Sequence, residues 1–438
     1  MDIQEYSDKY CVIGAGASGL AAVKNLKQLE IPFDCIEREN QVGGLWCYGK
    51  PYSAVYKSTH LISSKTMSGL LDFPMPADYP DYPNHEQVLA YLQSYAKQFD
   101  LNAHIQFNTT VDWIERDTDG LWLVKVSSLS GGTQTRRYRG IIIANGHLWD
   151  PRYPEYAGTF AGETIHARDY RTPDIFKHRR VLVIGGGNSG CDIAVEAAQN
   201  ADATFHSTRR GYHYIPKFIF GIPTDQFNEL SVRMGTPLFL RRAVSMLLIR
   251  LILGNPARLG MPNPDHKLLE SHPIINSQLM YYVAHGDIHP KPEVAALAGD
   301  SVLFTDGSRE QLDMIVYATG YKVTVPFIDQ KHLHWGKYAP DLYLHAFHPD
   351  YDNLFIAGML QPDSGVWWLT DLQCQLIARF IRAQRSDPKR AARFHAMKGG
   401  QQPDLRGGNR YIDSARHFHE IDHTAYARTV KRLLTMFP

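Results

Sequence analysis

The sequence lacks the cysteine pattern of a disulfide framework or a zinc site. It has five cysteines in 438 residues, an odd number, and no two of them form a C-x-x-C pair. They are scattered along the chain at Cys11, Cys35, Cys47, Cys191 and Cys374. Disulfide scaffolds and structural zinc sites need paired, regularly spaced cysteines. We therefore predict a cytoplasmic protein of a reducing compartment, with no disulfide framework, no redox cysteine pair and no bound metal.

The sequence also has almost no net charge and no targeting segment. Its 46 Lys and Arg residues are balanced by 45 Asp and Glu residues, which gives a formal net charge of +1. Nothing in this balance suggests a nucleic-acid partner. The first ten residues, MDIQEYSDKY, lack the basic and apolar regions of a signal peptide. Ordinary apolar and charged contents of 44% and 21% predict a globular protein of two or three domains.

No apolar run in the sequence is long enough to span a bilayer. The most apolar segment, LFLRRAVSMLLIRLIL at residues 238–253, is interrupted by Arg241, Arg242 and Arg250. A spanning helix needs about 20 mostly apolar residues. We favour a buried or half-buried helix with its arginines on one flank. Peripheral contact with a membrane surface is the alternative.

The sequence does contain two copies of a dinucleotide-binding pattern. In the first copy, a candidate strand at 10–13 leads into the loop GAGASG at 14–19, a helical pattern and a second apolar run. In the second copy, RVLVIGGGNSGCDIAVEAA places the loop at 185–190. Glycines at these spacings permit the tight turn, the close approach of a pyrophosphate and the packing of helix on strand. The following helix offers free N–H groups to the phosphates.

The residue after the second strand differs in charge between the two copies. Glu37 in the first copy and Arg209 in the second occupy nearly equivalent positions. A carboxylate can accept hydrogen bonds from ribose but repels a 2′-phosphate, whereas a guanidinium can bind that phosphate through two hydrogen bonds. The first loop should therefore hold FAD or NAD, and the second NADPH, with Arg210 assisting.

The rest of the chain frames these two units. Asn84 and Gln87 resemble a capping box that opens a helix through about Phe99. Alternating runs between 104 and 146 predict a small β-meander that rejoins the first domain through a strand at 140–144. Asp306-Gly307 marks a hairpin near the end of the second unit. NLFIAGML at 353–360 and a helix at about 367–385 belong to the first domain again.

We predict an α/β protein with two Rossmann-like dinucleotide-binding domains and a small β-meander. Residues 1–150 and 326–438 form an FAD-binding domain, and residues 151–325 form an inserted NADPH-binding domain.

The stretch FAGETIHARDYR, residues 160–171, resembles the flavin-containing monooxygenase fingerprint F-x-G-x-x-x-H-x-x-x-Y-R/K. The matching residues are Phe160, Gly162, His166, Tyr170 and Arg171. The resemblance covers nearly the whole chain, because GAGASGL, VYKSTHLISSKTM, DFPMPADYPDY and VYATGYKV also look like that family in its usual order. The Baeyer–Villiger relatives generally carry Trp where Tyr170 stands, so this chain looks more like a heteroatom oxygenase.

The resemblance implies an enzyme whose FAD is reduced by NADPH and reacts with O2. A flavin C4a-hydroperoxide would then transfer one oxygen atom to a sulfide or amine of a small molecule. FAD-binding residues are expected at Gly14, Ala15, Gly16, Ala17, Ser18, Gly19, Glu37, Arg38, Gly44, Leu45, Trp46, Ser63, Val111 and Gln361. NADP-binding residues are expected at Gly185, Gly187, Asn188, Ser189, Gly190, Asp192, Arg209, Arg210, Thr319 and Gly320.

We expect the fingerprint stretch to lie at the junction of the two domains. There His166 and Arg171 can hydrogen-bond, and Phe160 and Tyr170 can pack. A gating role for His166 and a plain hydrogen-bonded linker histidine both remain open.

One departure from the family pattern lies in YKSTHLISSK, residues 56–65. The family usually has an Asn where this chain has Ile62, and that Asn supplies a hydrogen bond near the flavin and bound NADP⁺. Isoleucine cannot supply it, although His60 or Ser63 could. The hydroperoxide is then expected to be short-lived and the enzyme partly uncoupled.

Several alternatives stay open at this point. They are Baeyer–Villiger oxygenation of a ketone, a largely uncoupled NADPH oxidase that produces hydrogen peroxide, and a non-enzymatic redox sensor. A flavin disulfide reductase is excluded because the chain lacks a redox cysteine pair. The expected partners are a small-molecule substrate and O2, and a homodimer is a further option.

Overall fold

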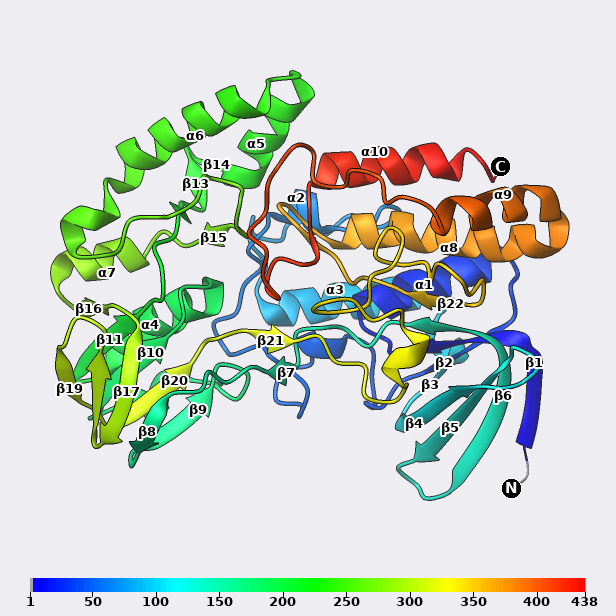
Figure 1. The fold of residues 1–438 in the computed structure, drawn as a ribbon, viewed down its shortest axis with the longest axis horizontal. Coiled ribbons are helices and arrows are strands. Elements are labelled where there is room, and N and C mark those ends of the chain that lie inside the picture. The colour runs from blue at the N-terminus through cyan, green and yellow to red at the C-terminus, as the bar shows by residue number, and fades with distance from the viewer. Residues whose placement is uncertain (1–2, 438) are drawn as a thin grey trace. The chain divides into compact units, whose positions relative to one another are not determined.

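The computed structural model describes residues 3–437, whose contacts divide the chain into two compact units (Figure 1). The first unit contains the chain up to residue 53, residues 65–147 and the chain from 323 onward. The second unit contains residues 54–64 and 148–322. Residues 54–64, which the sequence analysis placed in the first domain, therefore group with the second unit. The predicted α/β class is confirmed, because each unit is built on a sheet with parallel strands and flanking helices.

The first unit is built on a seven-stranded sheet in the order β3-β2-β1-β6-β5-β4, with β22 also paired to β6. The pairs β1–β2, β1–β6, β2–β3 and β22–β6 are parallel. The last four residues of β1, the run predicted as a strand, are all buried, as expected where helices cover both faces of a parallel sheet. The strands are β1 (Ile3–Ile13), β2 (Phe33–Ile36), β3 (Ile105–Gln106), β4 (Thr109–Arg116), β5 (Trp122–Ser128), β6 (Thr133–Ile143) and β22 (Leu354–Ile356).

The predicted β-meander is part of this same sheet. Strands β4, β5 and β6 pair antiparallel in sequence order. Strand β6 runs without a break from residue 133 to 143. Its residues 133–138 pair antiparallel with β5, and its residues 135–138 and 140–143 pair parallel with β1. The meander and the dinucleotide fold thus share one strand, where the sequence had suggested a separate strand at 140–144.

Helices of the first unit pack on the sheet and on one another. The capping box is confirmed: the Asn84 side chain accepts from the Gln87 backbone, and the Gln87 side chain accepts from the Asn84 backbone. Helix α8, predicted at about 367–385, contacts α1, α9 and α10. The helices are α1 (Ala17–Gln28), α2 (Lys65–Ser68), α3 (His85–Gln98), α8 (Trp367–Ser386), α9 (Pro388–Lys398) and α10 (His423–Leu434), and β23 (Gln361–Pro362) pairs with β24 (Glu420–Ile421).

The second unit is built on a five-stranded parallel sheet in the order β16-β11-β10-β20-β9. A second sheet, β19-β18-β17-β8, contains the predicted hairpin: Gly307 has φ +83°, and Asp306 accepts from the Ser308 backbone at 2.9 Å. The sheet strands are β8 (Ala157–Phe160), β9 (Glu163–His166), β10 (Arg180–Ile184), β11 (Ala203–Ser207), β16 (Ile288–Lys291), β17 (Val294–Gly299), β18 (Ser301–Phe304), β19 (Arg309–Gln311) and β20 (Met314–Tyr317).

Four helices and three small strand pairs complete the second unit. Short pairs join β7 to β21, β12 to β15 and β13 to β14. The helices are α4 (Asn188–Asn200), α5 (Thr224–Arg233), α6 (Leu238–Leu253) and α7 (Leu279–His285), and the small strands are β7 (Asp150–Pro151), β12 (Tyr214–Ile215), β13 (Phe218–Ile219), β14 (Ile222–Pro223), β15 (Ile274–Ile275) and β21 (Tyr321–Lys322).

Helix α6 coincides with the apolar segment singled out in the sequence. The prediction of a half-buried helix is confirmed, because Ile249 belongs to a buried cluster against which Met246 and Leu253 pack, while other residues of α6 such as Leu251 are exposed. The prediction that its arginines share one flank is wrong, since Arg242 pairs with Glu270 at 3.7 Å whereas Arg250 is exposed. Among residues 3–437, no helix is long and apolar enough to cross a membrane.

Candidate functional site

The first candidate site lies where the GAGASG loop joins β1 to α1. Gly14 has φ +100°, and a Cβ there would stand 2.7 Å from the Ala144 carbonyl oxygen at the end of β6. A Cβ on Gly19 would stand 1.8 Å from the Gly14 carbonyl oxygen. Helix α1 starts after Gly16 without a side-chain cap and without an acidic residue in its first turn, unlike α3 with its full capping box. The loop therefore presents a helix N-terminus suited to an anion.

Glu37 is fixed beside this loop at the end of β2. Its two carboxylate oxygens accept from the backbone N–H groups of Ala15 at 2.6 Å and Glu39 at 2.9 Å. Burial raises the pKa of Glu37, and these two N–H groups and Arg38 oppose that shift. Each carboxylate oxygen keeps a second lone pair for a ribose hydroxyl. The position and buried acceptor fit the ribose of a dinucleotide that has a free 2′-OH.

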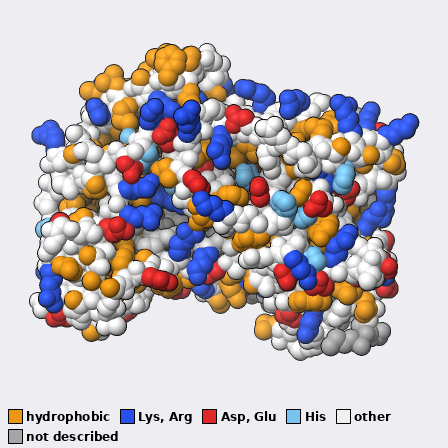
Figure 2. All heavy atoms as spheres, viewed as in Figure 1, with side chains coloured by type: hydrophobic (Ala, Val, Ile, Leu, Met, Phe, Trp, Pro, Cys, Tyr) orange, Lys and Arg blue, Asp and Glu red, His pale blue; other side chains and the backbone are white. Residues whose placement is uncertain are grey.

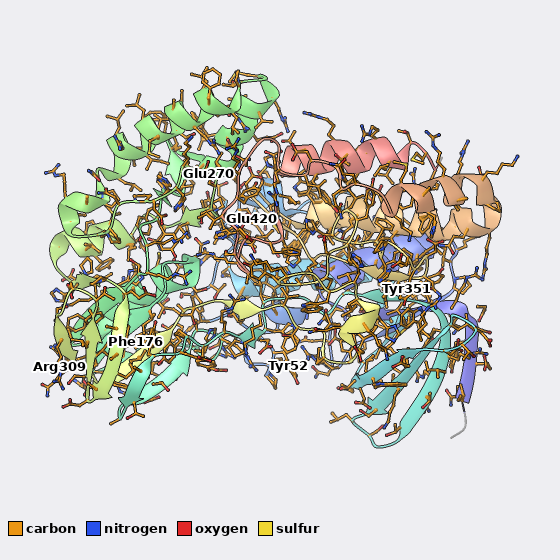
Figure 3. The ribbon with its side chains drawn as sticks, in the orientation of Figure 1. Tyr52, Phe176, Glu270, Arg309, Tyr351 and Glu420 are labelled. Carbon is orange, nitrogen blue, oxygen red and sulfur yellow. The ribbon has the colours of Figure 1, made fainter. Side chains whose placement is uncertain are left out.

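Other predicted FAD-binding residues border the same loop. A Cβ on Gly44 would stand 3.0 Å from the Gly16 Cα, so these two backbones approach closely. The Trp46 ring meets Trp367 edge-on at 6.1 Å, and the Arg38 guanidinium lies 3.2 Å from the centre of the Tyr52 ring. Figure 3 labels Tyr52. These contacts give the loop a close-packed wall with a cationic group at one end.

Three of the predicted FAD-binding residues have different surroundings. Val111 is a buried core residue of β4. Gln361 begins β23, and its backbone N–H donates to the His419 carbonyl at 2.9 Å. Ser63 belongs to the second unit, with His60 and Ile62. The structure therefore brings together the glycine loop, Glu37, Arg38 and Gly44–Trp46 but not the whole predicted set.

The second candidate site repeats the first arrangement at the loop between β10 and α4. Gly185 has φ +130°, and a Cβ there would stand 2.2 Å from the Ala318 carbonyl oxygen at the end of β20. A Cβ on Gly190 would stand 1.9 Å from the Gly185 carbonyl oxygen. Helix α4 follows Gly187 with no side-chain cap and no acidic residue in its first turn. In both loops the backbone therefore approaches neighbouring carbonyl groups more closely than a residue with a Cβ would allow.

The two arginines after β11 differ in their contacts. Arg210 lies 3.6 Å from the Asp265 carboxylate, whereas Arg209 is exposed and forms no ion pair with any described residue. A guanidinium without a carboxylate partner is suited to bind a phosphate, and Arg209 is therefore the stronger candidate of the two.

Polar residues of the first two turns of α4 have partners inside the protein. Asn188 accepts from the Ile275 backbone at 2.7 Å and donates to the Pro273 carbonyl at 3.1 Å. Asp192 accepts from the Asn276 side chain at 2.7 Å, and burial raises its pKa. These two predicted NADP-binding residues hold residues 273–276 against α4. Near the end of β20, the Thr319 hydroxyl donates to the Arg152 carbonyl at 2.5 Å.

The five fingerprint residues all lie inside the second unit. A Cβ on Gly162 would stand 2.5 Å from the Asp313 carbonyl oxygen and 2.6 Å from the Phe160 ring. Tyr170 is fully buried, donates to the Glu196 carboxylate and stacks on Phe176 with ring centres 5.2 Å apart. These contacts show why the stretch needs a glycine and a tyrosine at fixed spacing.

His166 is the last residue of β9 rather than part of a linker, which corrects the linker interpretation. Its Nδ1 accepts from the Arg168 backbone at 3.0 Å, and its ring lies edge-on to Tyr153 and Tyr321. Burial lowers the pKa of His166 to about 4, so the imidazole is neutral at pH 7.

Residues 54–64 form a strap across the second unit that the sequence analysis did not recognise. The Arg171 carbonyl accepts from the Lys57 backbone at 2.9 Å, and the Ser64 backbone donates to Asp225 at 2.6 Å. Ser58 donates to Glu196, the same carboxylate that receives Tyr170. The fingerprint residues Tyr170 and Arg171 therefore anchor this strap.

The three residues of interest on the strap differ in exposure. His60 is exposed, with Nδ1 at 2.7 Å from the Ser58 carbonyl oxygen, while Ile62 and Ser63 are partly buried. The sequence analysis did not identify Glu196 and Asp225, which hold the strap. The only sequence feature that could have pointed to Glu196 is its position four residues after Asp192, on the same face of α4.

Comparison with known proteins gives one consistent family. The family model described as flavin-binding monooxygenase-like matches residues 7–436. Flavin-containing monooxygenase 5 of Oryctolagus cuniculus is 30% identical, over 98% of this chain and 83% of its own length. Dimethylaniline monooxygenase [N-oxide-forming] 2 of Cavia porcellus is 33% identical over 85% of this chain and 73% of its own length.

Solved structures share the fold at lower identity. S-allyl-L-cysteine S-oxygenase of Allium sativum has a TM-score of 0.67 and 21% identity, over 98% of this chain and 88% of its own. OTEMO in complex with FAD and NADP has a TM-score of 0.67 and 18% identity, over 88% and 86%. These matches confirm the predicted family, enzyme class and cofactors, FAD and NADP. The chain belongs to the flavin-binding monooxygenase-like family and is an FAD-dependent oxidoreductase.

Proposed function

We propose that this enzyme uses NADPH and O2 to transfer one oxygen atom to a sulfide or amine of a small molecule. The observation that carries this proposal is a pair of glycine loops, each followed by a helix whose N-terminus has no side-chain cap. The buried Glu37 carboxylate lies beside the first loop, and the exposed Arg209 guanidinium follows the second strand of the other unit. The printed names of two relatives, an N-oxide-forming monooxygenase and an S-oxygenase, support a nitrogen or sulfur acceptor.

We assign FAD to the first unit and NADPH to the second. When bound, the flavin takes a hydride from NADPH and, once reduced, activates O2. The backbone N–H groups at the start of α1 hold the FAD pyrophosphate, and Glu37 accepts hydrogen bonds from the ribose. The N–H groups at the start of α4 hold the NADPH pyrophosphate. Compared with the predicted domains, 1–150 with 326–438 and 151–325, residues 54–64 and 148–150 move to the second unit and residues 323–325 move to the first.

Replacement of Arg209 tests the coenzyme assignment. Arg209→Ala should raise the KM for NADPH about tenfold to a hundredfold, because a charge-assisted contact worth about 1.5–3 kcal/mol is lost. The KM for NADH should change little, since NADH has no 2′-phosphate. Initial rates of coenzyme oxidation at varied NADPH and NADH measure both values.

Arg210→Ala is the matched control for this test. Because Arg210 already lies beside Asp265, its loss should affect the KM for NADPH much less. Equal effects of Arg209→Ala on the two coenzymes would show that Arg209 does not contact the 2′-phosphate.

Ile62 supports a second proposal, about how much of the NADPH oxidation leads to oxygenated product. The resemblance implies that position 62 lies near the flavin, and a partly buried isoleucine there offers no hydrogen-bond donor. We therefore propose that part of the NADPH consumed yields hydrogen peroxide. Ile62→Asn should lower the peroxide fraction, because one buried donor is worth about 1–3 kcal/mol, or roughly tenfold to a hundredfold in the ratio of competing rates.

The coupling test measures NADPH consumption, oxygenated product and peroxide in the same reaction. Ile62→Leu serves as the control, since it keeps an apolar side chain of equal size without a donor. If Ile62→Asn leaves the peroxide fraction unchanged or raises it, position 62 has no such role.

A further inference from the structure

A contiguous stretch of the second unit exposes an unusual number of large hydrophobic side chains. Of the large hydrophobic residues that are exposed within 3–437, more than half fall between 218 and 252. The most exposed are Phe220 at 80%, Phe239 at 74% and Leu251 at 73%. We call this set the apolar face: Phe218, Phe220, Ile222, Leu230, Met234, Phe239, Leu240, Val244, Leu247, Leu251 and Ile252. Figure 2 shows hydrophobic side chains gathered over α5 and α6 with Lys and Arg side chains nearby.

Helix α6 separates its exposed apolar residues from its packed ones. At about 100° per residue, the exposed residues Leu240, Val244, Leu247 and Leu251 point to one side of the helix. The buried Ile249 points to the other side. A large patch of this kind on a folded protein marks a surface that contacts something else.

Arginines border the apolar side of α6. On the same helical projection, Arg250 falls at one edge of the apolar side and Arg241 at the other. Neither forms an ion pair with any described residue. Arg242 falls on the packed side, where it lies 3.7 Å from Glu270, labelled in Figure 3. Arg250 is exposed and can extend its charged end along the border while its stem lies against apolar groups, whereas Nε and Nη1 of Arg241 are buried.

The segment around α6 carries a larger net positive charge than the chain as a whole. Residues 217–258 contain six basic and two acidic side chains, although the formal net charge of the chain is only +1. Asp225 accepts from the Ser64 backbone, and Glu229 pairs with Arg233 at 2.9 Å. The basic side chains are Lys217, Arg233, Arg241, Arg242, Arg250 and Arg258. The local excess of basic groups is complementary to an anionic surface.

This charge pattern decides between the two occupants that an apolar face could have. In a symmetric dimer the same patch would face itself, so the excess positive charge of one copy would meet that of the other. Anionic lipid headgroups would instead meet the arginines, while the acyl boundary receives the apolar side chains.

We propose that the apolar face docks this enzyme onto an anionic lipid surface. Helix α6 lies along the headgroup boundary, and Phe220, at the tip of the β13–β14 hairpin, enters beside it. The contact is peripheral, because no helix among the described residues can cross the bilayer.

Vesicle co-sedimentation of the full-length, FAD-loaded protein tests this proposal. We expect it to bind vesicles of phosphatidylcholine with phosphatidylglycerol, more weakly as salt rises, and to bind phosphatidylcholine alone much less. Leu247→Glu with Leu251→Glu should reduce binding about tenfold or more. Arg250→Gln should reduce binding to the anionic vesicles about fivefold.

Two matched variants test whether similar substitutions outside the apolar face also change vesicle binding. Leu129→Glu replaces a leucine that is 84% exposed in the first unit, and Arg393→Gln removes an exposed arginine of α9. Both should bind vesicles as the wild type does, and all variants should keep its unfolding midpoint. Absence of wild-type binding to the anionic vesicles would overturn the proposal. So would a concentration-dependent dimer that Leu247→Glu with Leu251→Glu dissociates.

Discussion

Gly19→Ala should yield a protein that no longer retains FAD. A Cβ at position 19 would stand 1.8 Å from the Gly14 carbonyl oxygen, far inside any real contact. Neither partner can move aside, because Gly14 itself has φ +100° and its own Cβ position lies 2.7 Å from the Ala144 carbonyl oxygen. The turn must open, and the start of α1 is displaced from the pyrophosphate position. We expect FAD affinity to fall by more than about a hundredfold, since loss of two charge-assisted hydrogen bonds already costs about 3 kcal/mol.

The equivalent substitution in the other unit is the matched comparison. A Cβ on Gly190 would stand 1.9 Å from the Gly185 carbonyl oxygen, so the steric conflict is the same. Gly190→Ala should purify yellow but lose rapid flavin reduction by NADPH. Gly399→Ala is the neutral control, because the nearest atom would be an ordinary 3.8 Å away and φ is negative.

Absorbance of the purified proteins and stopped-flow reduction by NADPH separate the two outcomes. A yellow Gly19→Ala protein with wild-type flavin content would show that the first loop does not hold FAD. Loss of flavin from Gly190→Ala alone would reverse the assignment of the two units.

Local features of the fold could be read from the sequence because their causes are local. The glycine spacings determine two turns in which Gly14 and Gly185 need positive φ. The Asn84 and Gln87 side chains satisfy backbone groups only three residues away, so the start of α3 is encoded within four residues. The place of Glu37 directly after β2 could likewise be read from the sequence, although its carboxylate also accepts from the Ala15 backbone in the preceding loop.

Features that depend on distant parts of the chain could not be predicted. The strap at 54–64 is held by Glu196 and Asp225, more than a hundred residues further along, and no local pattern announces such pairs. The placement of the α6 arginines on one flank was predicted wrongly, because hydropathy measures only what a side chain prefers. Which side of the helix is covered depends on the packing of the whole unit.

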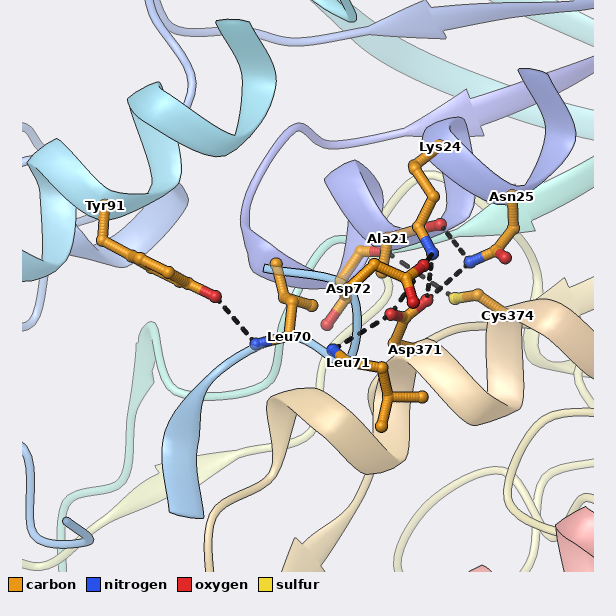
Figure 4. Close-up of polar contacts among 10 residues, drawn as sticks. Ala21, Lys24, Asn25, Leu70, Leu71, Asp72, Tyr91, Asp371 and Cys374 are labelled. Atoms are coloured by element: carbon orange, nitrogen blue, oxygen red, sulfur yellow. Dashed lines mark hydrogen bonds and ion pairs between the residues drawn. The ribbon is translucent and has the colours of Figure 1, made fainter. Parts of the chain in front are cut away.

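A buried ion pair joins α1 to α8 in the first unit. The Lys24 ammonium lies 3.0 Å from an Asp371 carboxylate oxygen, and both side chains are almost fully buried (Figure 4). Asp371 also accepts from the Asn25 side chain at 2.7 Å and the Leu71 backbone at 3.3 Å. Asp72 adds a second carboxylate at 2.8 Å from the Lys24 ammonium. Asp371 therefore keeps its ionic partner only while α1 stays beside α8, whereas Lys24 also has the half-exposed Asp72.

Asp371→Ala should lower the free energy of unfolding by about 3 kcal/mol, because the buried Lys24 ammonium loses its buried partner and keeps only the half-exposed Asp72 carboxylate. Lys24→Met with Asp371→Leu should recover much of that loss, since an apolar pair leaves no uncompensated charge. Urea unfolding at matched flavin content, followed by circular dichroism, measures both changes. Lys337→Met is the control, because the Lys337–Asp413 pair is exposed and should leave the unfolding midpoint unchanged.

Loss of this pair should also weaken FAD binding, because α8 supports the glycine loop directly. Gln373 on α8 accepts from the Gly358 backbone at 2.9 Å, and a Cβ on Gly358 would stand 1.9 Å from the Ser18 hydroxyl. A shift of α8 is therefore transmitted to the first turn of α1. If Asp371→Ala unfolds at the wild-type urea concentration, the pair contributes no net stability. If it unfolds earlier yet retains FAD as tightly as the wild type, α8 does not position the loop.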